Sequence, residues 1–183
     1  MRVIAGEARS IPLMTPEGKD TRPTQDRIKE TLFNIIQMSV PGSIFIDVFA
    51  GSGGIGIEAL SRGAKRAYFV ENAAEAVKCI TANLHKTHYD EKGVILKQDA
   101  LVGLRNISEK EVDVIFIDPP YQGGFYEKTI ALLSQLQYVT PDTQIILEAQ
   151  LDEDFSFVES YGFKIDREKL YKTNKHVFIS REV

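Results

Sequence analysis

Five short apolar runs alternate with amphipathic stretches between residues 43 and 149, and this alternation constrains the fold more than any other feature. The runs that predict strands are SIFIDVFA (43–50), RAYFVE (66–71), GVILKQD (93–99), VDVIFID (112–118) and TQIILEA (143–149). The stretches that predict helices are residues 53–64, 73–87 and 124–137. Strands of near-continuous apolar character that alternate with helices are typical of a parallel sheet covered on both faces. We therefore expect an α/β fold with a doubly wound, mostly parallel sheet.

The segments on either side of this region predict additions to the sheet. Residues 1–20 hold the short β-like runs RVIAG and SIPLM, which predict a hairpin or arm, and a helix should follow over 24–36. A short helix is expected over 151–160. FKIDREKLYK and NKHVFISREV then predict a closing antiparallel hairpin.

The length of 183 residues suffices for one domain with a full core. We expect a single domain over residues 1–183, with the β arm and first helix in 1–40 and a Rossmann-like core in 41–183. No apolar run approaches 18 residues, so a membrane span is not expected, and the N-terminus lacks the apolar core of a secretory signal.

Cysteine and histidine content narrows the class of protein further. One cysteine, Cys79, cannot form an internal disulfide and fits the cytoplasm, and its place on an apolar helix face predicts a core residue. Three histidines scattered along the chain give no metal-ligand spacing, so no metal is expected, and His85, His88 and His176 are expected at the surface.

A glycine-rich stretch, DVFAGSGGIGIEAL at residues 47–60, predicts a nucleoside-binding loop. Gly51, Gly53 and Gly56 have GxGxxG spacing between a predicted strand and a predicted helix. Glycines let the backbone turn sharply and approach a ligand closely. Glu71 ends the next predicted strand, where an acid accepts hydrogen bonds from ribose hydroxyls.

The acid that opens this stretch favours one class of nucleoside cofactor. Asp47 would repel a pyrophosphate, whereas it suits the ammonium group of S-adenosylmethionine, directly or through water. Asp99 ends the third predicted strand, where it is expected to accept from the adenine amino group, and Asp118 ends the fourth. Four acids at the carboxyl ends of neighbouring strands favour S-adenosylmethionine over NAD.

The stretch IDPPYQGG at residues 117–124 predicts the acceptor site. Asp118 and the backbone carbonyl of Pro119 can accept hydrogen bonds from an exocyclic amino group, which turns the nitrogen lone pair toward the methyl group. Prolines fix φ and donate nothing, so the carbonyl stays available. Tyr121 is expected to stack on the flat base after the base leaves its own stack.

These motifs together resemble the RsmD family across essentially the whole chain. The resemblance rests on RVIAG at the start, RPTQDRIKETLFNII at 22–36, DVFAGSGGIGIEALSRGA at 47–64 and FIDPPY at 116–121. It implies a Rossmann-like class I S-adenosylmethionine-dependent methyltransferase that modifies N2 of one guanine in bacterial 16S rRNA, with S-adenosylhomocysteine as product. The catalytic residues implied are Asp118, Pro119, Pro120 and Tyr121. The cofactor-binding residues expected are Asp47, Phe49, Gly51, Ser52, Gly53, Glu71, Asn72, Asp99 and Ala100.

The charge distribution permits contacts with RNA. The net charge of −4 is unlike that of a strong nucleic-acid binder, but basic residues slightly outnumber acidic ones in residues 1–35. The expected RNA-binding residues are Arg2, Arg9, Arg22, Arg27 and Lys29. The expected substrate is 16S rRNA. If ribosomal proteins help to hold the RNA, the substrate is an assembling small ribosomal subunit. Glu58, one turn into the cofactor helix, either orients the site from behind or forms a surface ion pair.

Three other functions stay open on the sequence. Adenine-N6 methylation of DNA uses the same chemistry, but the chain has no separate segment to read a DNA sequence. A dinucleotide-dependent oxidoreductase is disfavoured by Asp47. A non-catalytic RNA-binding domain would leave the DPPY motif idle.

Overall fold

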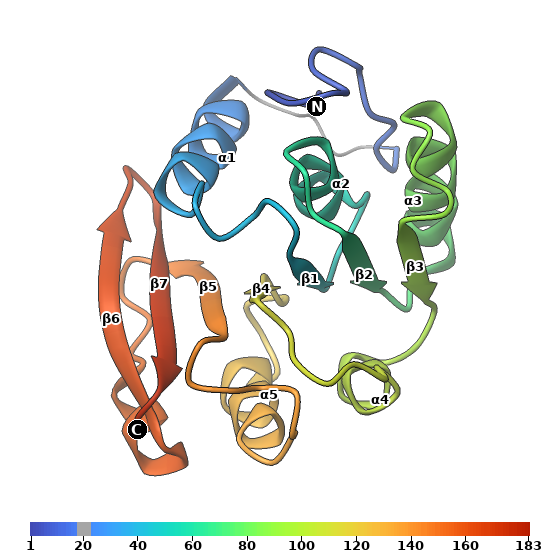
Figure 1. The fold of residues 1–183 in the computed structure, drawn as a ribbon. Coiled ribbons are helices and arrows are strands. Elements are labelled where there is room, and N and C mark those ends of the chain that lie inside the picture. Colours follow the sequence, from blue (N-terminus) through green and yellow to red (C-terminus); the bar gives the residue numbers. More distant parts are fainter. Residues whose placement is uncertain (18–22) are drawn as a thin grey trace.

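The computed structural model describes residues 1–17 and 23–183, and the strands within them form one mixed sheet (Figure 1). Its order is β3-β2-β1-β4-β5-β7-β6. The strands are β1 (Ile44–Val48), β2 (Arg66–Val70), β3 (Gly93–Leu96), β4 (Val114–Ile117), β5 (Gln144–Gln150), β6 (Phe163–Leu170) and β7 (Asn174–Arg181). The first five run parallel, and β7 pairs antiparallel with both β5 and β6. The predicted parallel sheet and closing hairpin are confirmed.

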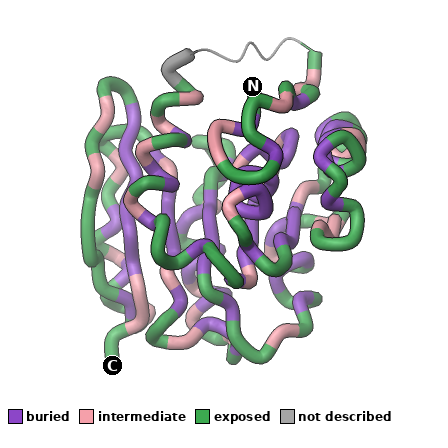
Figure 2. Tube along the Cα trace, turned by 45° about the horizontal axis from the view of Figure 1, so that its top comes forward, coloured by how far each residue is buried: buried purple, intermediate pink, exposed green. Residues whose placement is uncertain are grey.

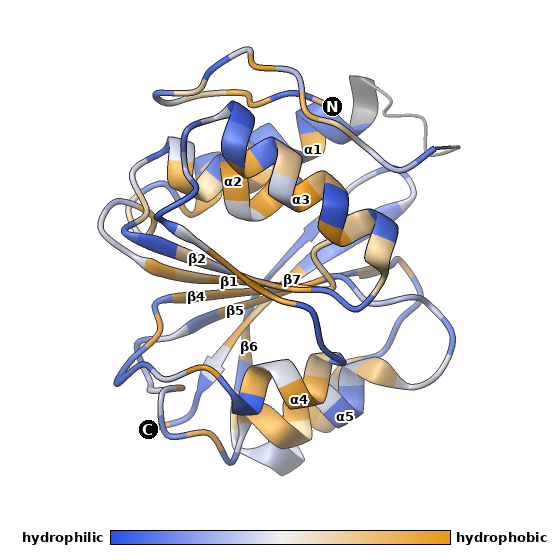
Figure 3. Cartoon of the chain, turned by 90° about the vertical axis from the view of Figure 1, so that its right-hand side faces the viewer, coloured by the Kyte–Doolittle hydropathy of each residue, from blue (hydrophilic) through white to orange (hydrophobic). Residues whose placement is uncertain are grey.

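Helices cover both faces of this sheet (Figure 3). One layer holds α1 (Pro23–Ile35), α2 (Gly54–Ser61) and α3 (Ala74–Lys86). The other holds α4 (Ala100–Arg105) and α5 (Phe125–Leu133), with the short 3₁₀ helix η1 (Ser156–Tyr161) beside α5. Two apolar clusters, one on each face, bury the sheet, so the central strands are buried along their length (Figure 2). This is the doubly wound α/β fold that the sequence predicts.

Three elements differ from the sequence prediction. The short helix expected over 151–160 is a 3₁₀ helix that begins only at Ser156, where Asp154 Oδ1 accepts a hydrogen bond from Ser156 N at 3.0 Å. Helix α4 was missed, because six residues are too few for a helical period to show, and Asp99 starts the helix by accepting a hydrogen bond from Leu101 N at 3.0 Å. The arm is described as far as residue 17 and holds a single bridge, between Arg2 and Pro12, in place of a regular hairpin. The division of one domain near residue 40 stays a prediction.

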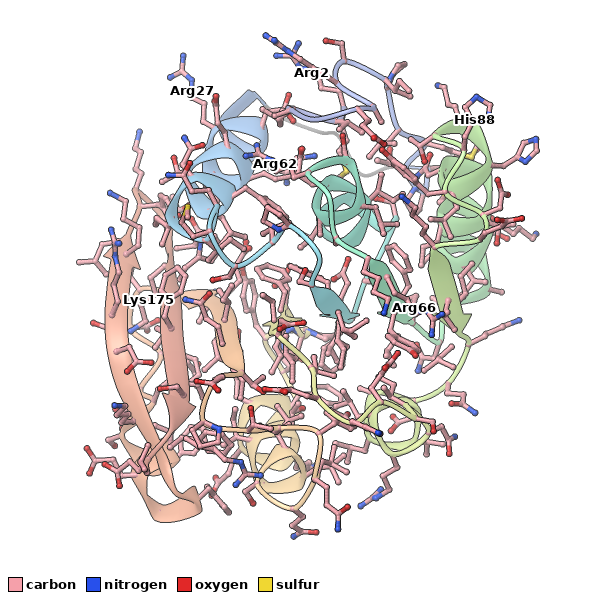
Figure 4. All side chains as sticks on the ribbon, in the orientation of Figure 1. Arg2, Arg27, Arg62, Arg66, His88 and Lys175 are labelled. Atoms are coloured by element: carbon pink, nitrogen blue, oxygen red, sulfur yellow. The ribbon has the colours of Figure 1, made fainter. Side chains whose placement is uncertain are left out.

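A buried carboxylate attaches the arm to the helical layer. Glu58 on α2 is fully buried, and its oxygens accept hydrogen bonds from Ile4 N at 2.7 Å and Ala5 N at 3.1 Å. Lys29 on α1 and Arg62 lie 3.4 and 3.3 Å from the same carboxylate. Figure 4 shows Arg62 between α1 and α2. The surface ion pair that the sequence offered for Glu58 is wrong, because the carboxylate is buried and holds the arm and the helices together. An orienting role behind the site stays a prediction.

This arrangement corrects the prediction for Lys29. Its side chain is 7% exposed, and its Nζ donates to Arg2 O at 2.7 Å as well as facing Glu58. Burial lowers the pKa of Lys29, and the carboxylate of Glu58 opposes that shift. The lysine was expected to contact RNA phosphates, but in the structure its charge faces Glu58 inside the protein.

Removal of the Glu58 carboxylate should destabilise the protein strongly. Glu58→Ala would leave the buried Lys29 and the partly buried Arg62 without their counter-charge, and we expect a loss of about 3–5 kcal/mol in the free energy of unfolding. Denaturant titration measures this loss, and hydrogen exchange should show residues 1–14 losing protection first. Glu75→Ala is the matched control, because its ion pair with Lys78 is exposed on both sides. That control should change stability by less than about 1 kcal/mol. An equal cost for the two variants would contradict the proposed role of Glu58.

Candidate active site

The strand order reverses between β1 and β4, and the predicted site residues lie at that point. From β1 the chain passes to β2 and β3 on one side and to β4 and β5 on the other. Open parallel sheets bind ligands in the crevice at the carboxyl ends of strands next to such a reversal. The register confirms that these ends are level, because Val48 pairs with both Val70 and Ile117. The loops after β1, β2 and β4 therefore meet at one edge.

The glycine loop after β1 turns tightly over this edge. Gly51 and Gly53 have φ of 57° and 82°, a region that favours glycine. A Cβ built on Gly51 would meet nothing within 4 Å, so this part of the loop faces open space. A Cβ on Gly56 would lie 2.4 Å from the ring of Phe69, so α2 packs as close to β2 as glycine allows. The loop thus has one face against the core and one face available to a ligand.

Asp47 lies inside β1, beneath this loop. Its side chain is buried, and Oδ2 accepts a hydrogen bond from Gly56 N at 2.9 Å, in the first turn of α2. Burial raises the pKa of Asp47 to about 8, while the Gly56 N–H opposes the shift and the carboxylates of Glu71 and Glu148 add to it. The sequence predicted the place of Asp47 at the cofactor loop but missed this bond to the helix.

The two other acids on the cofactor side also hold backbone. Glu71 accepts from Gly51 N at 2.8 Å and from Ala73 N at 3.0 Å, so it connects the glycine loop to the start of α3. Asp99 caps α4, and its side chain is exposed at the same edge. Glu71 is partly exposed and Asn72 beside it is exposed, so both can reach a ligand over the loop.

The remaining predicted cofactor residues differ in accessibility. Phe49 is partly exposed and packs edge-on against Phe125, with ring centroids 5.5 Å apart. Ser52 and Ala100 are each 7% exposed, so a ligand can reach little of either side chain. Asn83 Nδ2 donates to the Ser52 carbonyl at 3.0 Å and fixes the loop from below.

The acceptor motif opens onto a cavity of about 670 Å³. Asp118 and Tyr121 line it from the loop after β4, and both are exposed. Its other walls come from α1, the start of α2, the end of β5 and the tip of the β6–β7 hairpin. A cavity of this size can hold a nucleobase, and it adjoins the glycine loop through Gly54.

A polar cluster in this cavity was missed by sequence reasoning. Glu148 of β5, Asn174 and His176 of β7 all line it. His176 was expected at the surface, but β7 lies between β5 and β6, so the histidine is completely buried. Glu148 lies near the carboxyl end of β5, two residues before Gln150. The series of acids at strand ends would have included Glu148 if it had been extended to the fifth strand.

The predicted RNA-binding residues do not behave alike. Arg2 and Arg27 extend outward on the same side of the molecule (Figure 4), and Arg9 is also exposed. Arg2 lies 3.4 Å from Asp26, with 61% of its side chain exposed. Arg22 lies outside the described residues.

The part of the chain that the structure describes lacks two further features. It contains no helix long and apolar enough to cross a membrane. Across residues 1–17 and 23–183, no three histidine, cysteine or acidic side chains are grouped so as to hold a metal ion.

Comparison with known proteins assigns the family. A family model described as "Conserved hypothetical protein 95" matches residues 1–180. The chain belongs to this family. Its relatives include "Ribosomal RNA small subunit methyltransferase D" of Haemophilus influenzae, 34% identical over 88% of this chain and 84% of the relative. "Putative rRNA methyltransferase YlbH" of Bacillus subtilis is 34% identical over 88% of both chains. The resemblance to the RsmD family is therefore confirmed.

A solved structure supports the same fold. "Putative methyltransferase yhhF from Escherichia coli" superposes with a TM-score of 0.82 at 29% identity, over 100% of this chain and 98% of that one. The expected Rossmann-like class I methyltransferase fold is thereby confirmed. A methyltransferase fold implies a methyl donor.

Asp47 should give the stability of the protein a distinctive pH dependence. The unfolded chain loses this proton near the usual pKa of 3.8, but the folded protein keeps it until about pH 8. Between these values the folded state binds more protons, so the free energy of unfolding should fall as the pH rises, by at most about 1.4 kcal/mol per pH unit. Urea titrations from pH 5 to pH 8 measure this slope.

Substitution of Asp47 by asparagine should flatten the slope. The amide oxygen of Asp47→Asn can still accept from Gly56 N–H, but it does not ionise. Asp113→Asn is the control, because Asp113 also accepts a backbone N–H, from Ile44 at 2.7 Å, but is exposed. An unchanged slope in Asp47→Asn would assign the pH dependence to other groups.

Proposed function

We propose that this protein transfers a methyl group from S-adenosylmethionine to the N2 amino group of a guanine in 16S rRNA. The observation that carries the proposal is the DPPY loop, which opens onto a cavity large enough for a base, one strand away from the glycine loop. The names of the curated relatives support an rRNA substrate. A ribosomal substrate would place the enzyme in the cytoplasm.

The residues at the glycine loop fit S-adenosylmethionine better than a dinucleotide. Bound there, the cofactor would supply an electrophilic methyl group on a sulfonium centre. Asp47 already accepts the hydrogen bond of Gly56 N–H in the first turn of α2, and a pyrophosphate would need the N–H groups of that turn as donors. Glu71, Asn72 and Asp99 would bind the ribose and adenine from the exposed edge. An edge lined by carboxylates favours a ligand that carries positive charge and no phosphate.

Asp118 and Pro119 would prepare the amino group for transfer. Two N–H groups of the guanine amine would donate to the Asp118 carboxylate and the Pro119 carbonyl. This arrangement directs the nitrogen lone pair at the methyl carbon and stabilises the positive charge that grows on nitrogen. Pro120 would stiffen the loop, and Tyr121, 59% exposed, is free to stack on the flipped base. The product ammonium loses its proton to solvent.

The outward-facing arginines would hold the rRNA. Arg2, Arg9 and Arg27 are exposed, and we infer that they contact phosphates beside the cavity. Arg22 is expected to join them. A substrate held by an assembling small ribosomal subunit would supply further contacts, which suits an enzyme whose net charge is −4.

Variants of the acceptor loop should lose transfer and keep the cofactor. We expect Asp118→Ala to lower kcat by about 10²–10³, as removal of one positioned hydrogen-bonding group does. Tyr121→Ala should cost about 10–10², the worth of one base stack. Both should still be stabilised by S-adenosylhomocysteine, by about 2.7 kcal/mol at 100 times Kd, and not by NAD. Asp152→Ala, an exposed acid after β5, is the control. Full turnover in both loop variants would refute the assigned roles.

The substrate can be identified directly. Small subunits from a strain lacking this enzyme are incubated with labelled S-adenosylmethionine, and the methylated nucleotide is mapped. We expect label in a single N2-methylguanine of 16S rRNA. Label in adenine of added DNA and none in rRNA would move the assignment to the adenine-N6 class. Naked 16S rRNA, tested in parallel, shows whether ribosomal proteins are needed.

A further inference from the structure

Glu148 and Asp118 occupy matching positions on neighbouring parallel strands. Leu147 pairs with Ile117 at the end of the β5–β4 register. When this register is extended by one residue, Glu148 lies beside Asp118, the first residue after β4. Neighbouring strands are about 4.8 Å apart, and register partners direct their side chains to the same face. Both residues line the cavity that Tyr121 also lines. The cavity therefore presents two adjacent carboxylates.

The Glu148 carboxylate is held in one orientation by β7. His176, its cross-strand partner, places Nε2 2.9 Å from Oε2, and Asn174 Nδ2 donates to Oε1 at 3.2 Å. The other ring nitrogen of His176, Nδ1, lies 2.9 Å from the hydroxyl of Tyr171. A carboxylate only accepts, so His176 carries a proton on Nε2 whether it is neutral or charged.

Tyr171 completes this chain of hydrogen bonds. Burial raises the pKa of its hydroxyl to about 12, and the Glu148 carboxylate adds to the shift. A protonated Tyr171 can donate to Nδ1 of a neutral His176, which then donates from Nε2 to Glu148. In this series of hydrogen bonds, from Tyr171 through His176 to Glu148, each donor has an acceptor, and the series ends at the cavity.

The carboxylate keeps unused hydrogen-bonding capacity toward the cavity. Its two oxygens offer about four lone-pair sites, of which His176 and Asn174 take two. The Glu148 side chain is 25% exposed, whereas that of His176 is 1% exposed. What remains available is an acceptor, fixed in direction, next to the acceptor that Asp118 provides.

We propose that Glu148 is the residue that selects guanine, by accepting the N1–H of the base while Asp118 accepts from the neighbouring N2 amine. This inference rests on the proposed function and names the group that reads the base. Guanine presents two adjacent donors, N1–H and N2–H, which match two adjacent carboxylates. Adenine presents a lone pair at N1, which would face Glu148 and leave its oxygen unpaired. His176, Asn174 and Tyr171 are positioning residues, since they act through Glu148.

The test compares guanine with 2-aminopurine at the mapped nucleotide of the RNA substrate. 2-Aminopurine keeps the N2 amine that receives the methyl group, but its N1 carries a lone pair in place of N1–H. We expect the wild-type enzyme to favour guanine by about 10² or more in kcat/KM, because a buried acceptor is left unpaired by the analogue. S-adenosylhomocysteine binding, measured alongside, reports that the donor site is intact.

Glu148→Gln should weaken the selection for guanine. Its amide N–H₂ can donate to the N1 lone pair of 2-aminopurine, so the preference for guanine should fall to less than about tenfold. Tyr171→Phe should lower that preference partway, a change that lost stability alone would not produce. Glu168→Gln is the matched control. Glu168 of β6 forms an ion pair at 3.3 Å with Lys175, which lies on β7 next to His176, but Glu168 does not line the cavity. The control should keep the wild-type preference.

The outcomes separate this inference from the function beneath it. Wild-type activity on guanine, with the same preference retained in Glu148→Gln, would overturn the role of Glu148 and leave the methyltransferase proposal in place. Wild-type inactivity on guanine in mapped small subunits would refute the proposed function itself, and the reading of guanine with it. A loss of preference in Glu148→Gln and not in Glu168→Gln is the result that we expect.

Discussion

The close approach of α2 to β2 is the constraint on which the rest of the structure depends. Gly56 lets the helix meet the ring of Phe69 directly, and the Asp47 carboxylate fixes Gly56 N at 2.9 Å. With the helix held there, the glycine loop must cross the carboxyl edge of the sheet, and Glu58 further along α2 must lie where the arm and α1 can reach it. The position of α2 thus determines where the glycine loop lies on one side and where the wall of the cavity lies on the other.

Much of this could be predicted from the sequence, and the failures have physical reasons. Apolar runs located the strands along the chain and glycine spacing located the loop, because both signals are local. The burial of Lys29, Glu58 and His176 was not predicted, because each depends on a partner far away in the chain. His176 is the plainest case. Its segment alternates little, and only the insertion of β7 between β5 and β6 makes it central.

The acids at the sheet edge show how a site can carry negative charge and still have ordered loops. Asp47, Glu71 and Asp99 each accept a backbone N–H, and Glu148 accepts from His176 and Asn174. Each bond offsets part of the cost of holding carboxylates close together. The partly exposed Glu71 and the exposed Asp99 therefore maintain the loops and also create a field that suits a cationic ligand. Asp47, the most deeply buried of the acids at the sheet edge, meets that cost by holding its proton more tightly.

The position of β7 also bears on how the molecule is made. Synthesis produces β5 and β6 before β7, yet in the sheet β7 lies between them. A nascent chain therefore has an unpaired edge on β5 until residues 174–181 have left the ribosome. The cavity lacks its wall of Asn174 and His176 for the same period. The wall of the cavity is thus completed only after β7 has been inserted between two strands that were made before it.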